Sequence, residues 1–347
     1  MRFYNVTIYN KNPDGSQGSI YTGADISGNT PIFPLNTQDQ FGNSIRGALN
    51  VEFDLTVADS STPINSFIRI WGIPLSMLNQ ASNFNGKFIE IGGGMQNGLP
   101  LANPKQQGLL ARGIIKSAWG NWQGTEQTLD FMISPGAGTQ QLSAANVPIS
   151  ISIKAGQILG EAIAISLNQA YTSGGNLLVN FDVNVSDSLI STKAFTANYN
   201  NLQSFNTAMK DLSKTIITDI NYLGITITLT PTAIVVTDGY GPPIAPPLQL
   251  NYVDFIGQPT WIEAQVMQIK MVMRGDLPQI GNQVQLPSFS NGAKMPVLNT
   301  EQSNPLVRQG LTFTNTMTIK QIKHVGAYRS PSGDAWVTIV DLIVNPS

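Results

Sequence analysis

The sequence contains one histidine, His324, and no cysteine. A histidine acts as a catalytic base beside a nucleophile that it activates and a carboxylate that orients it. His324 lies near the end of a strand-like run, residues 319–325, and the chain has no G-x-S-x-G motif that would supply a nucleophilic serine. We therefore predict a structural or binding-surface role for His324. The two counts also exclude a His-rich metal site, a Cys-ligated zinc or iron–sulfur site and a disulfide framework.

The carboxylates show no arrangement typical of acid–base catalysis. Glu126 and Asp130 lie four residues apart on one face of a predicted strand. At a rise of ~3.3 Å per residue their backbones are about 13 Å apart, which is too far for direct partnership. We therefore expect no catalytic residues and no enzymatic activity, and in particular no peptidoglycan hydrolase.

Two short motifs resemble binding loops but lack their decisive residues. The run Gly92-Gly93-Gly94 follows a predicted strand, yet it has neither the spacing of a dinucleotide fingerprint nor the Lys-Ser/Thr ending of a phosphate loop. It predicts a bulge or a tight turn that ends the strand. Asn10, Asn12 and Asp14 resemble the start of a calcium loop, but Tyr21 stands where the closing glutamate should be. We expect no cofactor and no metal.

The composition is poor in charge and rich in amides. Charged residues make up 12% of the 347, against a usual ~25%. The 31 Asn and 24 Gln are about 16% of the chain, and apolar residues make up 41%. A disordered chain would carry more charge and fewer apolar residues. A weakly charged surface repels copies of itself poorly, so this surface suits coverage by neighbouring subunits, although compositional drift explains it equally well.

Charge balance and hydropathy limit the classes of partner that the protein can bind. The formal net charge is −2, from 19 Lys+Arg and 21 Asp+Glu, and the basic residues are scattered. A nucleic-acid binder usually shows a basic excess, because neutralised phosphates supply most of its affinity. No apolar run approaches the ~20 residues that span a bilayer, and the N-terminus lacks the apolar stretch of a signal peptide. We expect that the protein does not insert into a membrane. We also expect that it assembles in a cytoplasm, or that it is exported by a route other than its own signal peptide.

The first part of the chain reads as β structure. Residues 49–57 alternate apolar and polar with period two, which is typical of a strand with one buried face. Further strands are predicted at residues 3–9, 67–71 and 87–91, and a pair at 109–119 and 125–133. Residues 74–81 predict a short helix with Pro74 in its first turn. Several short strands with turn residues between them indicate a barrel or a sandwich.

The middle of the chain mixes helices and strands. The strongest helical pattern consists of apolar residues at steps of three and four, namely Leu202, Phe205, Met209, Leu212 and Ile216. Residues 158–171 predict a second helix. Strands are predicted at residues 147–153 and 178–185, and a hairpin at 225–236. The order β-α-β-α-β-β describes a small α+β domain.

A proline-rich segment, residues 241–247, predicts a stiff, extended linker and is the clearest boundary in the chain. β patterning returns after it in residues 265–273, 311–325 and 336–344. We therefore predict a mainly β protein with three domains: a first β domain at 1–138, an α+β insert at 139–240, and the linker with a second β domain at 241–347.

Several short sequence segments resemble those of baseplate hub proteins of contractile-tailed bacteriophages. They are Ile70-Trp71-Gly72-Ile73-Pro74-Leu75, then residues 98–110, then Gly120-Asn121-Trp122-Gln123-Gly124, and past the linker Phe255-Ile256-Gly257-Gln258-Pro259-Thr260-Trp261. Residues 67–135 are the best stretch of a resemblance that covers most of the chain. These are family patterns, not chemical motifs, and the family offers no catalytic residues.

The resemblance implies two tail-tube-like β-barrels in one chain, flanking the inserted α+β domain. Three copies would give a pseudo-sixfold ring that adapts a hexameric tail tube to a threefold central spike and lets DNA pass. The implied partners are other copies in a homotrimer, the tail tube protein, the central spike and other baseplate proteins. The implied location is the virion tail baseplate. Loops 92–108 and 287–308 would then make the contacts between subunits.

The alternative is a carbohydrate- or receptor-binding tail protein. Aromatic faces and amides suit sugar surfaces and hydroxyls, and the candidate site is Asn121 flanked by Trp119 and Trp122. Buried aromatic residues at a barrel end are the reading of this triplet that we favour. Composition fits both functions, and the 67–135 pattern is what favours the hub.

Overall fold

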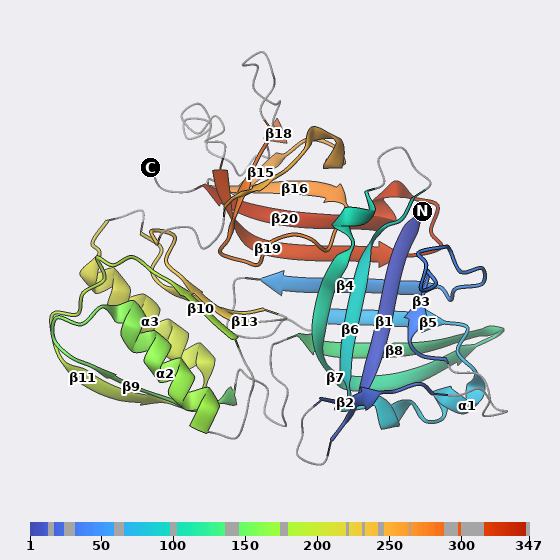
Figure 1. Cartoon of the computed structure of the whole chain (residues 1–347), viewed down its shortest axis with the longest axis horizontal. Coiled ribbons are helices and arrows are strands. Elements are labelled where there is room, and N and C mark those ends of the chain that lie inside the picture. Colours follow the sequence, from blue (N-terminus) through green and yellow to red (C-terminus); the bar gives the residue numbers. More distant parts are fainter. Residues whose placement is uncertain are drawn as a thin grey trace.

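The computed structural model consists of two β regions with a smaller α+β unit beside them (Figure 1). It describes residues 1–12, 17–23, 32–58, 66–97, 103–135, 146–173, 180–219, 222–230, 233–241, 246–263, 265–287, 298–299 and 316–344. Within these residues the protein is mainly β, as the sequence predicts, and most strands belong to one large, predominantly antiparallel sheet.

The first β region contains eight strands and three short helical turns. The strands are β1 (Arg2–Lys11), β2 (Gln17–Ile20), β3 (Leu35–Asn36), β4 (Val51–Ala58), β5 (Ser66–Trp71), β6 (Phe88–Met95), β7 (Gly108–Gln123) and β8 (Glu126–Pro135). The helical turns are α1 (Leu75–Leu78), η1 (Ala81–Phe84) and η2 (Pro104–Gln106). Within the predicted helix at 74–81 the structure has the single turn α1, and η1 begins only at Ala81.

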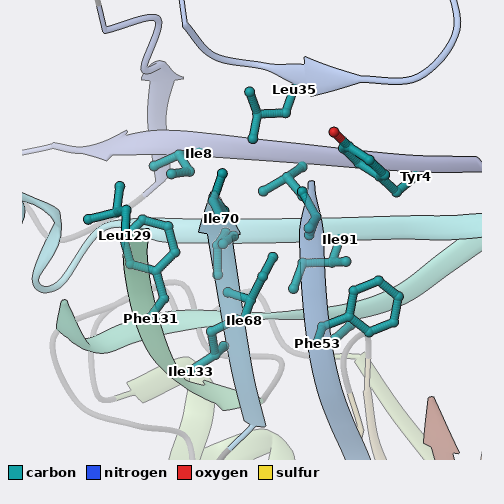
Figure 2. Packing of buried hydrophobic residues seen from close by; sticks show 14 of the residues in the cluster. Tyr4, Ile8, Leu35, Phe53, Ile68, Ile70, Ile91, Leu129, Phe131 and Ile133 are labelled. Atoms are coloured by element: carbon teal, nitrogen blue, oxygen red, sulfur yellow. The ribbon is translucent and has the colours of Figure 1, made fainter. Parts of the chain in front are cut away.

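Alternating residues of these strands build one apolar core, as the period-two pattern predicts. Ile68 and Ile70 of β5 and Leu129 and Phe131 of β8 all point into it and are fully buried (Figure 2). Strands β1, β6 and the first part of β7 lie across β4, β5 and β8, and this core fills the space between them (Figure 1). Strand β7 belongs to both layers, and its register against β8 shifts between residues 115 and 117, which lets it bend.

The glycine run does not end its strand, contrary to the prediction. Strand β6 continues through Gly92, Gly93 and Gly94 to Met95, paired with β1 on one side. The register against β7 shifts at Ile91/Gly92, so the predicted bulge is present. At Gly94 the backbone φ is +149° and a Cβ would lie 2.9 Å from Gln107 Cα, which explains the need for glycine inside the strand.

The middle unit is α+β. Helices α2 (Leu159–Ser173) and α3 (Leu202–Ile216) lie between two small sheets. One sheet contains β10 (Asn180–Asn184), β12 (Thr226–Leu229) and β13 (Ala233–Thr237), and the other β9 (Ile149–Ile153) and β11 (Phe195–Tyr199). The predicted hairpin is β12–β13, whereas β11 was not predicted. The helical stripe is buried where expected, since Leu202, Phe205 and Met209 face the core.

The second β region follows residues 241–247, of which the structure describes only part. It contains β14 (Leu248–Gln249), β15 (Thr260–Glu263), β16 (Val266–Val272), β17 (Gln283–Gln285), β18 (Leu298–Asn299), β19 (Thr316–Ala327) and β20 (Trp336–Val344), with turns η4 (Tyr252–Asp254) and η5 (Gly333–Ala335). Its separate apolar core includes Leu250, Ile269, Met271, Val340 and Leu342.

Strands β4 and β19 join the two β regions into one sheet. The second half of β19 pairs antiparallel with β4, from Gln321↔Ala58 to Ala327↔Glu52. The first part of β19 pairs instead with β17, and β20 runs along its whole length. The resulting strand path runs from β18 to β2 and is open at both ends among the described residues, so the two closed barrels of the prediction are not confirmed.

The two β regions also touch away from this ladder. The indole Nε1 of Trp336 donates a hydrogen bond to the Gly94 carbonyl at 2.9 Å, and Trp336 lies in the first apolar core. The backbones of Gly108 and Gly275 approach so closely that a Cβ at Gly108 would lie 2.2 Å from the Gly275 carbonyl oxygen. Contacts between the two β regions are therefore not confined to the β4–β19 ladder. The domain limits 1–138, 139–240 and 241–347 stay a prediction.

Candidate functional site

Two clusters of polar side chains stand out from the apolar framework. The outer-face cluster lies on the solvent side of β5, β8 and β7 and consists of Arg69, Trp71, Asn121, Gln123, Glu126, Thr128 and Asp130. The junction cluster lies between the two β regions and consists of Gln106, Asp254, Arg274, Asp276, His324 and Thr338.

Strand register assembles the outer-face cluster. Residues alternate along each strand, so the neighbours of the buried Ile68, Ile70 and Leu129 point to the opposite face. Arg69 of β5 lies opposite Asp130 of β8, and Trp71 lies opposite Thr128. On the other side of β8, Asn121 of β7 lies opposite Thr128, and Gln123 lies opposite Glu126. Three strands thus place these side chains in adjacent rows.

A buried carboxylate organises one end of the cluster. Asp130 is fully buried and accepts two hydrogen bonds from Arg69, from Nε and Nη2, each at 2.8 Å. Asn121 donates a third, from Nδ2 to Asp130 Oδ2, at 2.8 Å. The hydrogen bond to Asp130 raises the pKa of Arg69 despite its partial burial. The guanidinium also lies over the rings of Phe67 and Trp71, at 5.4 and 5.7 Å from their centroids. These contacts fix both side chains before any ligand arrives.

The other end of the cluster is a pocket of about 130 Å³, lined by Arg69, Trp71, Asn121, Gln123, Glu126 and Thr128. Trp71 is one of these lining residues, and its Nε1 is buried and has no hydrogen-bond partner. Among the side chains that the structure describes, it is the only buried nitrogen or oxygen without one. An unpaired buried donor costs about 1–3 kcal/mol, so it calls for a physical reason.

The predicted sugar site at residues 119–122 is only partly assembled. Trp119 shares the outer face with Asn121, and its ring lies 6.4 Å from that of Phe67. Trp122 falls on the opposite face of β7 because side chains alternate along a strand. Its indole Nε1 donates to the Gly124 carbonyl at 2.8 Å, and its side chain is 61% exposed. Trp119 and Trp122 therefore do not flank Asn121 on one surface.

The junction cluster is centred on a buried arginine. Arg274 is 3% exposed; it donates from Nε and Nη2 to Asp276 at 2.7 and 2.8 Å, and from Nη1 to Asp254 at 3.0 Å. Gln106 Nε2 of the first β region donates to the other oxygen of Asp254 at 2.8 Å. Burial alone would lower the pKa of Arg274, but Asp276 and Asp254 outweigh it and raise the pKa. The network links both β regions through paired charges.

His324, the single histidine, belongs to this junction. It lies on β19, is 4% exposed, and its Nδ1 hydrogen-bonds Thr338 Oγ1 at 2.9 Å. Thr338 Oγ1 also accepts the backbone N–H of Arg274 at 3.1 Å. Burial lowers the pKa of His324 to about 3, so the ring is neutral at physiological pH. His324 thus belongs to the contacts between β19 and β20, and its structural or binding-surface role stays a prediction.

A second cavity of about 180 Å³ lies beside His324, where the α+β unit meets both β regions. Its lining is mostly aliphatic and includes Leu110, Leu277 and Ile280, with Thr230 from the middle unit. Thr230 Oγ1 donates to Gln279 Oε1 at 3.1 Å, which fixes the middle unit to the loop before β17. This mostly aliphatic lining suits packing between the units better than it suits catalysis.

The remaining sequence candidates form no site in the described residues. Asp14 of the calcium-like loop lies outside them, as do most of loop 287–308 and part of loop 92–108. The described part of the chain holds no group of three or more His, Cys, Asp or Glu residues placed to bind a metal ion. None of the described helices has both the length and the apolar character needed to cross a bilayer.

No protein-family model matches the sequence, and no curated protein matches it as a relative. Several solved structures are similar. The 43 kDa tail protein of prophage MuSo2 from Shewanella oneidensis is 10% identical, with a TM-score of 0.48, over 99% of this chain and 97% of that one. The tail protein from Neisseria meningitidis MC58 is 10% identical, with a TM-score of 0.46, over the same shares. In the Francisella PdpA–VgrG complex, a chain 10% identical aligns with a TM-score of 0.44, over 100% of this chain and 59% of that one.

Proposed function

We propose that the chain is a structural protein of a phage tail, a baseplate hub that assembles as a homotrimeric ring. The observation that carries the proposal is the β4–β19 ladder, which holds two β regions with separate cores side by side in one chain. If each β region serves as one tube-like unit, three copies supply six units. Such a ring can match a hexameric tube on one side and a threefold spike on the other.

The composition supports the same proposal. An amide-rich surface can hydrogen-bond to neighbouring subunits with less desolvation cost than a charged one. The near balance of 19 basic and 21 acidic residues leaves little net attraction for a polyanion, so DNA could pass a central channel without being retained. Partners in the proposal are other copies of the chain, the tail tube protein, the spike and other baseplate proteins.

Analytical ultracentrifugation followed by electron microscopy tests the proposal. We expect a particle of three times the 37.4 kDa chain mass, whose class averages show a ring with six lobes and threefold symmetry. If the chain alone stays monomeric, it is mixed with the tail tube protein of the same phage, and a trimeric ring is expected on the tube end. A monomer in both experiments, or a ring without six similar lobes, would contradict the proposal.

A further inference from the structure

The cavity beside His324 lies where the three parts of the chain meet. Its volume is about 180 Å³, and residues of both β regions and of the α+β unit form its walls. An apolar cavity of roughly 150 Å³ inside a protein can hold one benzene molecule. Leu109 belongs to the wall and is 39% exposed, so the lining reaches the molecular surface. The space therefore suits a single six-membered ring that enters from solvent.

Most of the wall is aliphatic. The apolar side chains come from β4, β7 and β19 and from the segment that follows β16, and they include Val57, Leu110, Leu277, Ile280 and Ile322. Water finds few hydrogen-bond partners against such walls, whereas an apolar ring gains contacts on several sides. The lining therefore favours a mostly apolar molecule over water.

The charges around the cavity favour a neutral ligand. Arg274 is the charged residue of the lining, and it donates three hydrogen bonds to the carboxylates of Asp276 and Asp254. Two carboxylates more than balance one guanidinium, so the site offers little attraction to an anion. His324 is neutral at physiological pH because its burial lowers the pKa.

His324 supplies a polar group that the protein does not use. Its Nδ1 is hydrogen-bonded to Thr338 Oγ1, and no described residue hydrogen-bonds its Nε2. Nε2 is not sealed inside the protein, because Trp71 Nε1 is the single fully enclosed, unpaired side-chain nitrogen or oxygen among the described residues. His324 lines the cavity, so Nε2 can reach a ligand there.

A hydroxyl group is the match for this nitrogen. The tautomer of His324 decides whether Nε2 donates or accepts, and a hydroxyl can do the opposite in either case. A phenol joins one such hydroxyl to a six-membered apolar ring. It is uncharged at pH 7, because the pKa of a phenolic hydroxyl is about 10.

We propose that this cavity binds one neutral, monocyclic phenol from solution, with the ring against the aliphatic wall and the hydroxyl hydrogen-bonded to His324 Nε2. A molecule bound there contacts both β regions and the α+β unit, so it fastens the three parts to one another. The site lies within one chain and does not depend on the proposed trimer.

Calorimetric titration of the full-length protein at pH 7 with phenol, benzene and benzoate tests the proposal. We expect phenol to bind about tenfold more tightly than benzene, the equivalent of ~1.4 kcal/mol, and benzoate not to bind. Leu277→Trp places a larger side chain in the cavity from a half-buried position, and it should abolish phenol binding. Leu223→Trp is the matched control, since Leu223 is 50% exposed and is not part of the lining, and it should bind phenol like the wild type.

A second variant tests the hydrogen bond itself. His324→Phe keeps an aromatic ring and removes both nitrogens, so it should bind phenol and benzene with equal affinity. Circular dichroism checks that each variant is folded, and if His324→Phe is not, the wild-type preference for phenol and the result with Leu277→Trp decide. The proposal is overturned if phenol does not bind the wild type, if benzene or benzoate binds it as tightly, if Leu277→Trp still binds phenol, or if folded His324→Phe keeps the preference.

Discussion

The junction cluster and the outer-face cluster are built from similar residues, yet they differ in how completely they are paired. At the junction, Arg274 reaches two carboxylates, and Gln106 holds the far oxygen of Asp254. On the outer face, Asp130 is equally well paired, but the Trp71 N–H beside it has no partner. The junction network connects two β regions through paired groups, whereas the outer face leaves one buried donor unpaired. Loss of a partner should therefore cost more stability at the junction than on the outer face.

Removal of the junction cation gives the largest expected effect. Arg274→Leu leaves Asp254 and Asp276 without their cation, and breaking a buried pair in this way costs about 3–5 kcal/mol of unfolding free energy. Urea titration followed by fluorescence measures it. Lys270→Met, which breaks the exposed pair of Lys270 with Asp334, is the control and should cost about 0.5 kcal/mol. A loss below that of the control would show that the junction network does not hold the β regions together.

Acid should weaken the junction through His324. Its folded pKa of about 3 lies below the unfolded value of 6.5, so the unfolded chain binds the proton more readily. The stabilisation from the neutral ring is complete above pH 6.5 and falls by about 1.4 kcal/mol for each pH unit from there down toward pH 3.

Urea titrations at pH 7, 6 and 5 measure this slope, in a range where most carboxylates stay ionised. We expect His324→Gln to be less stable than the wild type at pH 7 but nearly independent of pH over the same interval. Equal slopes in the two proteins would mean that His324 does not titrate as its burial requires.

The buried carboxylate of the outer face should have an intermediate effect. Asp130→Asn removes the charge that Arg69 and Asn121 share, but Arg69 is partly exposed and can return to water. We expect a loss of about 1–2 kcal/mol in unfolding free energy, measured by urea titration. Asp334→Asn, at a carboxylate that is 68% exposed, is the control and should change it by less than about 0.5 kcal/mol. A loss as large as that of Arg274→Leu would remove the distinction between the two clusters.

The smallest effect is expected at the unpaired indole. Trp71→Phe removes an unpaired buried donor, whose desolvation costs about 1–3 kcal/mol, but the smaller ring also loses packing contacts, so the two changes oppose each other and the unfolding free energy should change by less than about 0.5 kcal/mol. Trp336→Phe is the matched comparison, because the Trp336 N–H donates to Gly94 across the two β regions. It should cost about 1 kcal/mol or more. Similar losses in the two variants would show that the Trp71 N–H is paired in solution.

Period and spacing predicted the elements that bury one face. The alternation at residues 49–57 became β4, and the stripe from Leu202 to Ile216 became α3. Strand β11 was missed because its residues are half-buried or exposed, and its pairing with β9 rather than its own pattern makes it a strand. The glycine run was misread as a stop, since the close approach of the Gln107 backbone that requires glycine at position 94 comes from the turn before β7.

The outer-face pocket could not be predicted as a site because its members come from three strands. Arg69 and Asp130 are far apart in sequence and meet only through the β5–β8 register. A partial signal was present: Arg69 and Trp71 alternate with buried isoleucines, and Thr128 and Asp130 alternate with Leu129 and Phe131, so each pair must share a face. The sequence-based prediction grouped Trp122 with Asn121 because they are neighbours in the chain. It did not apply the alternation of side chains along a strand, which places the two on opposite faces of β7.

The shared strand β19 has a mechanical consequence. Its ladder with β4 runs antiparallel over residues 321–327, so a load that pulls the two β regions along the strand direction acts on all of its hydrogen bonds at once. A load across the strands opens the same bonds one after another and meets far less resistance. The junction of the two β regions therefore resists sliding along the strands more strongly than separation across them. Strand β20, which pairs with β19 along its length, distributes an axial load from one region into the other.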